Sequence, residues 1–106
     1  MSTELAWAAG FFEADGCTGI NGHQYFRLVF DQHGLDCPVE LIRIVNELGG
    51  TVGGPWQPKG LGKKLRWRVS YHGKKARSVF SKLEPYLTAD SIKIAKALKE
   101  IKACRT

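Results

Sequence analysis

Two sets of residues in this 106-residue chain have types and spacings that could carry out chemistry. The first is a carboxylate, Asp15, which stands between a mostly apolar run and Gly16. The second is a group of closely spaced cations in the middle of the chain: Lys59, Lys63, Lys64, Arg66 and Arg68. A carboxylate suits a hard divalent cation such as Mg²⁺, and a group of cations suits a phosphate backbone.

The run before Asp15 predicts a helix from about residue 3 to residue 15, with Gly16 as its stop, because Ala is frequent and Pro is absent. At ~100° per residue, one stripe of this helix carries the small residues together with one acid. That stripe consists of Ala6, Ala9, Gly10 and Glu13. Since the rest of the helix is apolar, one side can pack on the chain's own core. The small residues can then receive a helix at close range, most simply from a second copy, which predicts a homodimer interface.

Such a two-fold pairing would bring Asp15 of both copies together. Each carboxylate would lie at the negative end of a helix dipole and beside a like charge, an arrangement that a bound Mg²⁺ would neutralise. The alternative is that Asp15-Gly16 is only a turn that ends the helix. The residues by themselves leave both interpretations open.

Composition limits the function classes. The net charge of +6 favours a polyanionic partner, and no apolar run is long enough to span a membrane. The length predicts one domain, residues 1–106.

The three cysteines, Cys17, Cys37 and Cys104, show no metal-binding or disulfide spacing. Together with the lack of a signal peptide, this predicts a reducing intracellular compartment, which is the cytoplasm, the nucleoid or an organelle matrix. Zinc held by Cys17, Cys37 and the scattered histidines is a weaker alternative.

The remaining elements follow from periodicity and turn signals. We expect strands in residues 17–24, 25–32 and 65–72, and another that begins at 51–54. We expect helices over about 37–48, capped by Asp36, and from 74 to Pro85. A last helix follows a cap at Thr88 or Asp90, with its apolar residues inward (Ile94, Ala95, Leu98, Ile101) and its lysines outward (Lys93, Lys96, Lys99, Lys102). This order predicts an α+β fold in which helices cover one face of an antiparallel sheet.

Alternation along the strands predicts what the other face of the sheet carries. The residues expected there are Tyr25, Arg27, Asp31, Arg66, Arg68, Ser70 and His72, beside Lys59, Lys63 and Lys64 of the adjoining loop. Lysines would hold phosphates while Tyr25, Arg27, Arg66 and Arg68 read base edges in the major groove. Strands of about eight residues span ~26 Å, so two copies would cover a partly palindromic site of about twenty base pairs. The alternative is that these polar residues simply face water.

Residues 8–16, Ala-Ala-Gly-Phe-Phe-Glu-Ala-Asp-Gly, resemble the motif of the LAGLIDADG homing endonucleases, with apolar exchanges and Glu for the first Asp. The predicted element order is also that of a single LAGLIDADG module, α-β-β-α-β-β-α. The resemblance implies a homodimeric, Mg²⁺-dependent DNA endonuclease of the intron- or intein-associated type, which makes a staggered double-strand cut in a long site.

The resemblance also implies roles for individual residues. Asp15 would hold the metal with a carbonyl near Ala14, and Gln32, at the end of the second strand, would position the attacking water. Family members often carry a Lys just after the Pro-containing link to the last helix, but here residues 88–91 are Thr-Ala-Asp-Ser. Either Lys93 or Lys74 substitutes, or the protein cuts slowly or not at all. Glu13 points ~160° away from Asp15 on a helix, so we interpret it as an interface or capping group.

Two other interpretations remain. The missing link lysine favours a binding-only LAGLIDADG protein, either a DNA-binding regulator or an RNA maturase that helps an intron to splice. The chain could also be an excised or engineered half of a protein with two motifs.

Overall fold

The computed structural model describes residues 2–57, 64–88 and 91–104. Its helices are α1 (Thr3–Asp15), α2 (Val39–Leu48), α3 (Gly73–Leu83) and α4 (Ile92–Ala103), with a short 3₁₀ helix η1 (Glu84–Tyr86). Its strands are β1 (Gly16–Ile20), β2 (Phe26–His33), β3 (Gly53–Trp56) and β4 (Arg66–His72). The α+β element order predicted from the sequence is confirmed.

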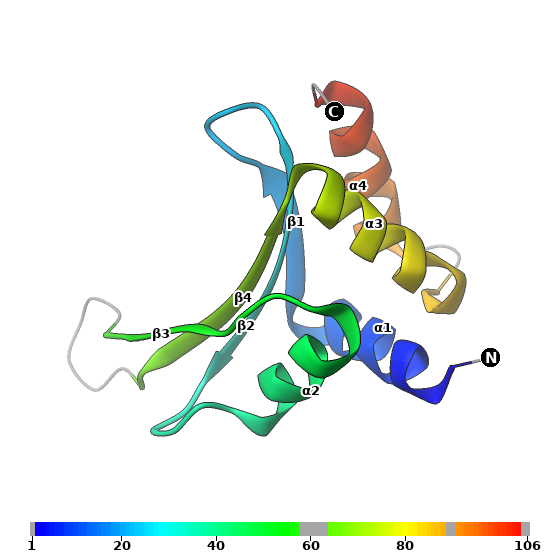
Figure 1. Ribbon diagram of the computed structural model, residues 1–106. Coiled ribbons are helices and arrows are strands. Elements are labelled where there is room, and N and C mark those ends of the chain that lie inside the picture. Colours follow the sequence, from blue (N-terminus) through cyan, green and yellow to red (C-terminus); the bar gives the residue numbers. More distant parts are fainter. Residues whose placement is uncertain (1, 58–63, 89–90, 105–106) are drawn as a thin grey trace.

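The strands form one antiparallel sheet in the order β1-β2-β4-β3. All four long helices lie on one side of it (Figure 1), with α4 against β1 and α3 against β2 and β4. Phe26, Leu28 and Phe30 of β2 point toward the helices and are fully buried. The opposite side, which we call the open face, is left uncovered by the helices of the described residues (Figure 1).

Helix α1 has the bounds that the sequence predicts, but its buried side differs. Ser2 caps it by accepting a hydrogen bond from the Leu5 amide at 3.1 Å. Ala9 is fully buried with Ala8 and Phe12, so its assignment to a dimer interface was wrong: this alanine packs into its own subunit's core. The small residues that the subunit leaves exposed on α1 are Ala6, Gly10 and Ala14.

Gly16 joins α1 directly to β1 without a loop. Its φ of −87° and ψ of 162° are extended, so the residue does not end the helix through a left-handed conformation. Glycine is needed for space instead, because a Cβ at this position would collide with the ring of Phe12 and lie 2.9 Å from the Phe12 carbonyl oxygen. The close approach of strand to helix therefore fixes where Asp15 lies.

Two boundaries differ from the prediction. Asp36 does not cap α2: Pro38 occupies the capping position without a side-chain hydrogen bond, and its carbonyl accepts from the amides of Leu41 and Ile42 at 3.1 and 3.4 Å. Strand β3 begins later than residue 51 and runs through Pro55, which an edge strand tolerates because it needs no donor on its outer side.

Helix α4 is rotated relative to the prediction. Ser91 caps it, with its hydroxyl accepting from the Lys93 amide at 3.2 Å, whereas Thr88 bonds elsewhere and Asp90 lies outside the described residues. Ala97 is buried and Leu98 is 43% exposed. Ala95 is also exposed, so the inward placement of Ala95 and Leu98 was wrong, and the helix packs through Ile94, Ala97 and Ile101.

Tyr71 makes a polar contact from β4 into the turn after α2. Its side chain is 3% exposed, and its hydroxyl donates to the Gly49 carbonyl at 2.7 Å. Burial raises the pKa of Tyr71 to about 12. The phenol is therefore held in its neutral form well above the pH at which an unfolded chain would release the proton.

This shift predicts a pH-dependent stability. Between pH ~10 and pH ~12 the unfolded chain loses the phenol proton first, so the free energy of unfolding falls as pH rises. Replacing Tyr71 with Phe should lower the free energy of unfolding by about 1 kcal/mol at neutral pH, through the lost hydrogen bond. The substitution should also reduce, by about 1–2 kcal/mol, the fall in the free energy of unfolding at alkaline pH. Urea unfolding at neutral and alkaline pH measures both; parallel pH curves for the two proteins would contradict the expectation.

Candidate carboxylate site and nucleic-acid interface

The carboxylate singled out in the sequence meets the predicted glutamine. Asp15 is exposed at the end of α1, and its Oδ2 accepts a hydrogen bond from Nε2 of Gln32 at 3.4 Å. The β1–β2 register causes this proximity, since Gly16 pairs with Phe30 and Gln32 lies two residues further along the same side of β2. The structure therefore brings together two of the four residues expected to be catalytic.

The metal-binding capacity of one subunit is limited. Over the described residues, no group of three or more His, Cys, Asp and Glu side chains could hold a metal ion, so the zinc alternative gains no support. The Asp15 carboxylate and the backbone carbonyls at the end of α1, including that of Ala14, are the hard oxygen donors that Mg²⁺ prefers. They fit Mg²⁺ in chemistry, but one carboxylate per subunit falls short of a full ligand set.

Lys93 lies beside this site but is committed to the backbone. Its ammonium donates to the carbonyl oxygens of Phe12 at 2.9 Å and Gly16 at 2.7 Å, and it lies 5.5 Å from the Phe12 ring centroid. A cation at the negative end of α1 stabilises the helix and joins α4 to both sides of the Asp15 position. The expectation that Lys93 points outward was wrong for this reason.

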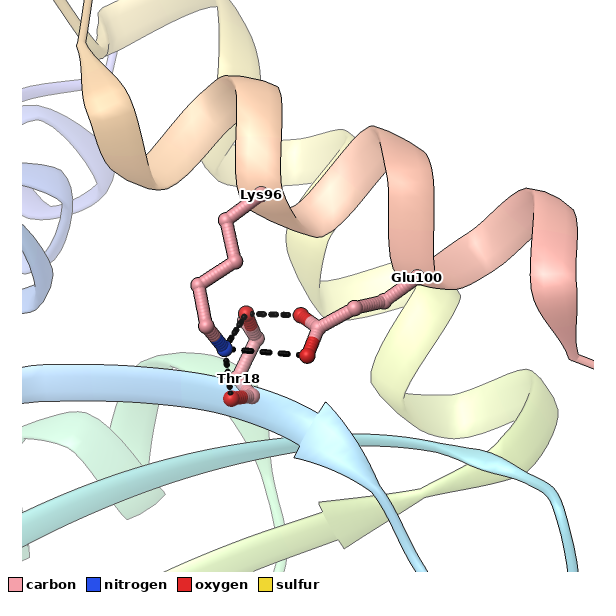
Figure 2. Close-up of polar contacts among 3 residues, drawn as sticks. All are labelled: Thr18, Lys96 and Glu100. Atoms are coloured by element: carbon pink, nitrogen blue, oxygen red, sulfur yellow. Dashed lines mark hydrogen bonds and ion pairs between the residues drawn. The ribbon is translucent and has the colours of Figure 1, made fainter.

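Lys96 also turns inward, toward β1. Figure 2 shows its ammonium directed at Thr18 and Glu100. It donates to the Thr18 carbonyl and pairs with Glu100 at 2.9 Å, while the Thr18 hydroxyl donates to the other Glu100 oxygen. Two of the four α4 lysines therefore bond to other parts of the fold, whereas Lys99 and Lys102 are exposed and have no hydrogen bond or ion pair among the described residues.

Glu13 binds within its own subunit. Its carboxylate accepts from the backbone amide of Thr88 at 2.6 Å and from the Thr88 hydroxyl at 3.3 Å. This contact is neither a helix cap nor an interface contact: the carboxylate anchors the link between η1 and α4. Thr88 is consequently engaged and does not cap α4.

Lys74 lies away from Asp15. It follows the end of β4 at which His72 pairs with Arg27, and it lines an open hollow with Tyr25, His72 and Gly73. Asp15 instead lies near the other end of β2, beside Gln32. The topology thus does not bring Lys74 to the carboxylate of its own subunit, and the geometry gives its predicted catalytic role no support.

The open face carries the predicted polar residues. By strand alternation Arg27 and Asp31 of β2 share it with the polar residues of β4, which are Arg66, Arg68, Ser70 and His72. Tyr25 is 38% exposed just before β2. Lys64 is exposed at the edge of the described residues, and Lys59 and Lys63 lie outside them.

One arginine of the open face is fixed by a carboxylate. Arg68 donates from Nε and Nη2 to the two oxygens of Asp31 at 2.7 and 3.1 Å, across directly paired positions of β2 and β4. The hydrogen bond to Asp31 raises the pKa of Arg68 above its ordinary value. The guanidinium also lies 5.5 Å from the Trp56 ring. Arg68 therefore presents its remaining N–H groups in a set direction.

Two other arginines of this face have unused hydrogen-bonding capacity. Nε of Arg27 and Nε of Arg66 are both buried, and within the described part of the chain neither has a partner. Arg66 approaches His33, with 3.3 Å between Nη2 and Nε2. The guanidinium of Arg27 lies over Gly19 of β1, where a Cβ would come within 3.4 Å of Nη2.

Sequence reasoning missed three residues of this surface. His33 extends the alternation of Arg27 and Asp31 by one more step, so a strand one residue longer would have included it. Trp56 ends β3, two residues beyond the segment 51–54 in which the strand was predicted to begin. Asn21 orders the hairpin: its Oδ1 accepts from the amides of His23 and Tyr25 at 2.9 and 3.1 Å, and its Nδ2 lies 3.2 Å from Nδ1 of His72.

Comparison with known proteins gives a fold-level likeness. The chain is similar to the solved structure "Group I Intron-encoded Homing Endonuclease I-CeuI Complexed With DNA", with a TM-score of 0.55 and 15% sequence identity. The match covers 96% of this chain and 52% of that one, so the chain spans about half the length of that endonuclease. No protein-family model matches the chain, and no curated protein matches it in sequence. The likeness therefore shows a LAGLIDADG homing-endonuclease type of fold.

No helix in the described part of the chain is long and apolar enough to cross a membrane.

The contacts of Lys93 predict a structural role. Lys93→Met keeps most of the side-chain length but removes the donor to the Phe12 and Gly16 carbonyls, and it should lower the free energy of unfolding by about 1–2 kcal/mol. Lys99→Met, at an exposed position of the same helix, should change it by less than about 0.5 kcal/mol. Urea unfolding compares the two. Full stability with lost activity in Lys93→Met would instead indicate a catalytic lysine.

Proposed function

We propose that the protein is a homodimeric, site-specific DNA endonuclease that cuts both strands of a long, partly palindromic site. The observation that carries this proposal is the meeting of Asp15 and Gln32 at the end of α1. The resemblance of residues 8–16 to the LAGLIDADG motif and the fold likeness to a homing endonuclease support it.

The dimer would form through the exposed side of α1. Ala6, Gly10 and Ala14 recur every four residues along it, and a Cβ built on Gly10 meets no atom within 4 Å. Two such helices can approach closely because no long side chain separates them. A two-fold axis here would bring the Asp15 carboxylates of the two copies together, at the centre of the bound duplex.

In this arrangement Asp15 of each copy, with the carbonyl near Ala14, would hold Mg²⁺. When bound, the ion would lower the pKa of the attacking water and stabilise charge on the phosphate. The chain's own residues position the reactants. Gln32 orients the Asp15 carboxylate through Nε2 and has Oε1 available to accept a hydrogen bond from that water.

The open face would bind the duplex. A sheet surface of this kind fits the major groove, where Arg66, Arg68 and Arg27 can donate to base edges and Tyr25 can contact a neighbouring base or phosphate. The loop lysines 59, 63 and 64 would hold phosphates at the rim.

A randomised duplex library incubated with the protein and Mg²⁺ tests cleavage directly, since linear cut products identify both the activity and the site. With that site in hand, Asp15→Asn should slow cutting by at least about 100-fold and leave duplex affinity within about threefold, because it removes a charge at the reacting phosphate but no donor to the bases. Asp36→Asn, at an exposed carboxylate of the loop before α2, is the matched control and should cut normally. Undiminished cleavage by Asp15→Asn would refute the role of that carboxylate.

A second candidate is a binding protein that does not cut efficiently, either a DNA-binding regulator or an RNA maturase. The commitment of Lys93 to two backbone carbonyls favours it, because that ammonium is not free to stabilise charge on a phosphate. Retention of a duplex from the library without cut products would support this candidate over the endonuclease.

The dimer is tested separately. Gly10→Leu would place a branched side chain between the two α1 helices, and it should raise the dimer dissociation constant at least tenfold, which is about 1.4 kcal/mol. Ala95→Leu, at an exposed position of α4, should leave self-association unchanged. Sedimentation velocity over a concentration series measures both, and a wild-type monomer at every concentration would rule out the proposed pairing.

A further inference from the structure

Helix α3 carries a basic surface that the proposed function does not use. Its sequence, GKKARSVFSKL, contains four cations and no acidic residue. Lys74, Lys75, Arg77 and Lys82 are exposed, and no hydrogen bond or ion pair engages them among the described residues. By contrast, Arg43, Arg68 and Lys96 each pair with an acid. Like charges this close along one helix repel one another, which an anionic partner would relieve.

Two open hollows make this surface continuous with the sheet. The first is lined by Tyr25, His72, Gly73 and Lys74, and the second by Lys74, Arg77, Ser78 and Ser81. Lys74 belongs to both. The surface therefore runs from the edge of the open face, around the junction of β4 and α3, and along the outer side of α3. We call Lys74, Arg77, Ser78 and Ser81 the corner surface.

The position of the corner surface relates it to the proposed DNA path. In β2, residues near Phe30 lie beside Gly16 and Asp15, whereas Arg27 pairs with His72 at the strand's other end. Figure 1 shows the β1–β2 hairpin and the start of α3 at this second end of the sheet, away from the end of α1. A duplex whose centre lies at Asp15 would therefore pass this corner as it leaves the half-site.

We propose that the corner surface binds phosphates of the duplex DNA that flanks the recognised site and draws that DNA around the β4–α3 junction. The inference rests on the proposed function, because it takes the duplex to lie on the open face. Ammonium, guanidinium and hydroxyl groups are the usual donors to phosphate oxygens. Contacts of this kind carry no sequence information, so the corner surface would add affinity without adding specificity.

The test compares two duplexes that contain the selected site. One ends at the edge of the site, and the other extends it by about one helical turn on each side. Wild-type protein should bind the extended duplex about tenfold more tightly in low salt, and this gain should shrink as salt is raised. The double variant Lys74→Gln/Arg77→Gln should bind both duplexes equally and keep its affinity for the short one within about twofold. Fluorescence anisotropy measures all the affinities.

The matched control is Lys99→Gln/Lys102→Gln, which removes the same charge from exposed positions of α4 that line neither hollow. It should keep the gain from flanking DNA. If the wild type binds the short duplex but gains nothing from the extension, or if the corner variant keeps the gain, this inference fails and the proposed function stands. If the wild type binds neither duplex, both fail.

Discussion

The direct passage from α1 into β1 at Gly16 is the constraint on which the rest of the structure depends. Because no loop separates the two elements, the last residue of the helix must lie at the edge of the sheet. The space for this junction exists only because position 16 lacks a side chain that would meet Phe12. The β1–β2 pairing then carries Gln32 to the same place, so a contact between residues 17 positions apart follows from one glycine and one strand register.

Helix α4 secures this junction from the other side. Lys93 bonds to the carbonyls of residues before and after Asp15. Lys96 and Glu100 both bond to Thr18 of the next strand. In the link before α4, Thr88 donates to the Glu13 carboxylate. These contacts join segments more than 70 positions apart along the chain. The covalent junction between α1 and β1 alone would not hold those segments together. Because Lys93 and Lys96 donate to backbone carbonyls, their ammonium groups are not free to bind an anion.

The sequence predicts the elements better than it predicts the contacts. Helix α1 and strand β4 follow from local signals: a run without Pro closed by Gly, and strict alternation from Leu65 to His72. Ala9 was misassigned because Ala6, Ala9 and Ala14 are alike in sequence, and only tertiary packing decides which of them is buried. The contacts of lysine side chains are harder still to predict from the sequence. Lys93 and Lys99 are lysines of the same helix and residue type alone does not tell them apart, yet one reaches carbonyls 77 and 81 positions away and the other faces water.

The charges of the molecule fall into two kinds that suit different tasks. Arg68 is held by both oxygens of Asp31, so its direction is fixed but its charge is largely offset. A guanidinium held in one direction can distinguish one base edge from another, but once its charge is offset it contributes little long-range attraction. The cations of α3 have the opposite character, because among the described residues they have no acidic partner and can follow an irregular phosphate backbone. A surface that needed only affinity would gain nothing from placing Asp31 among its arginines, since a carboxylate repels phosphate. Under the proposed function, the pairing of Asp31 with Arg68 suits an open face that selects a sequence, while the cations of α3 would provide attraction.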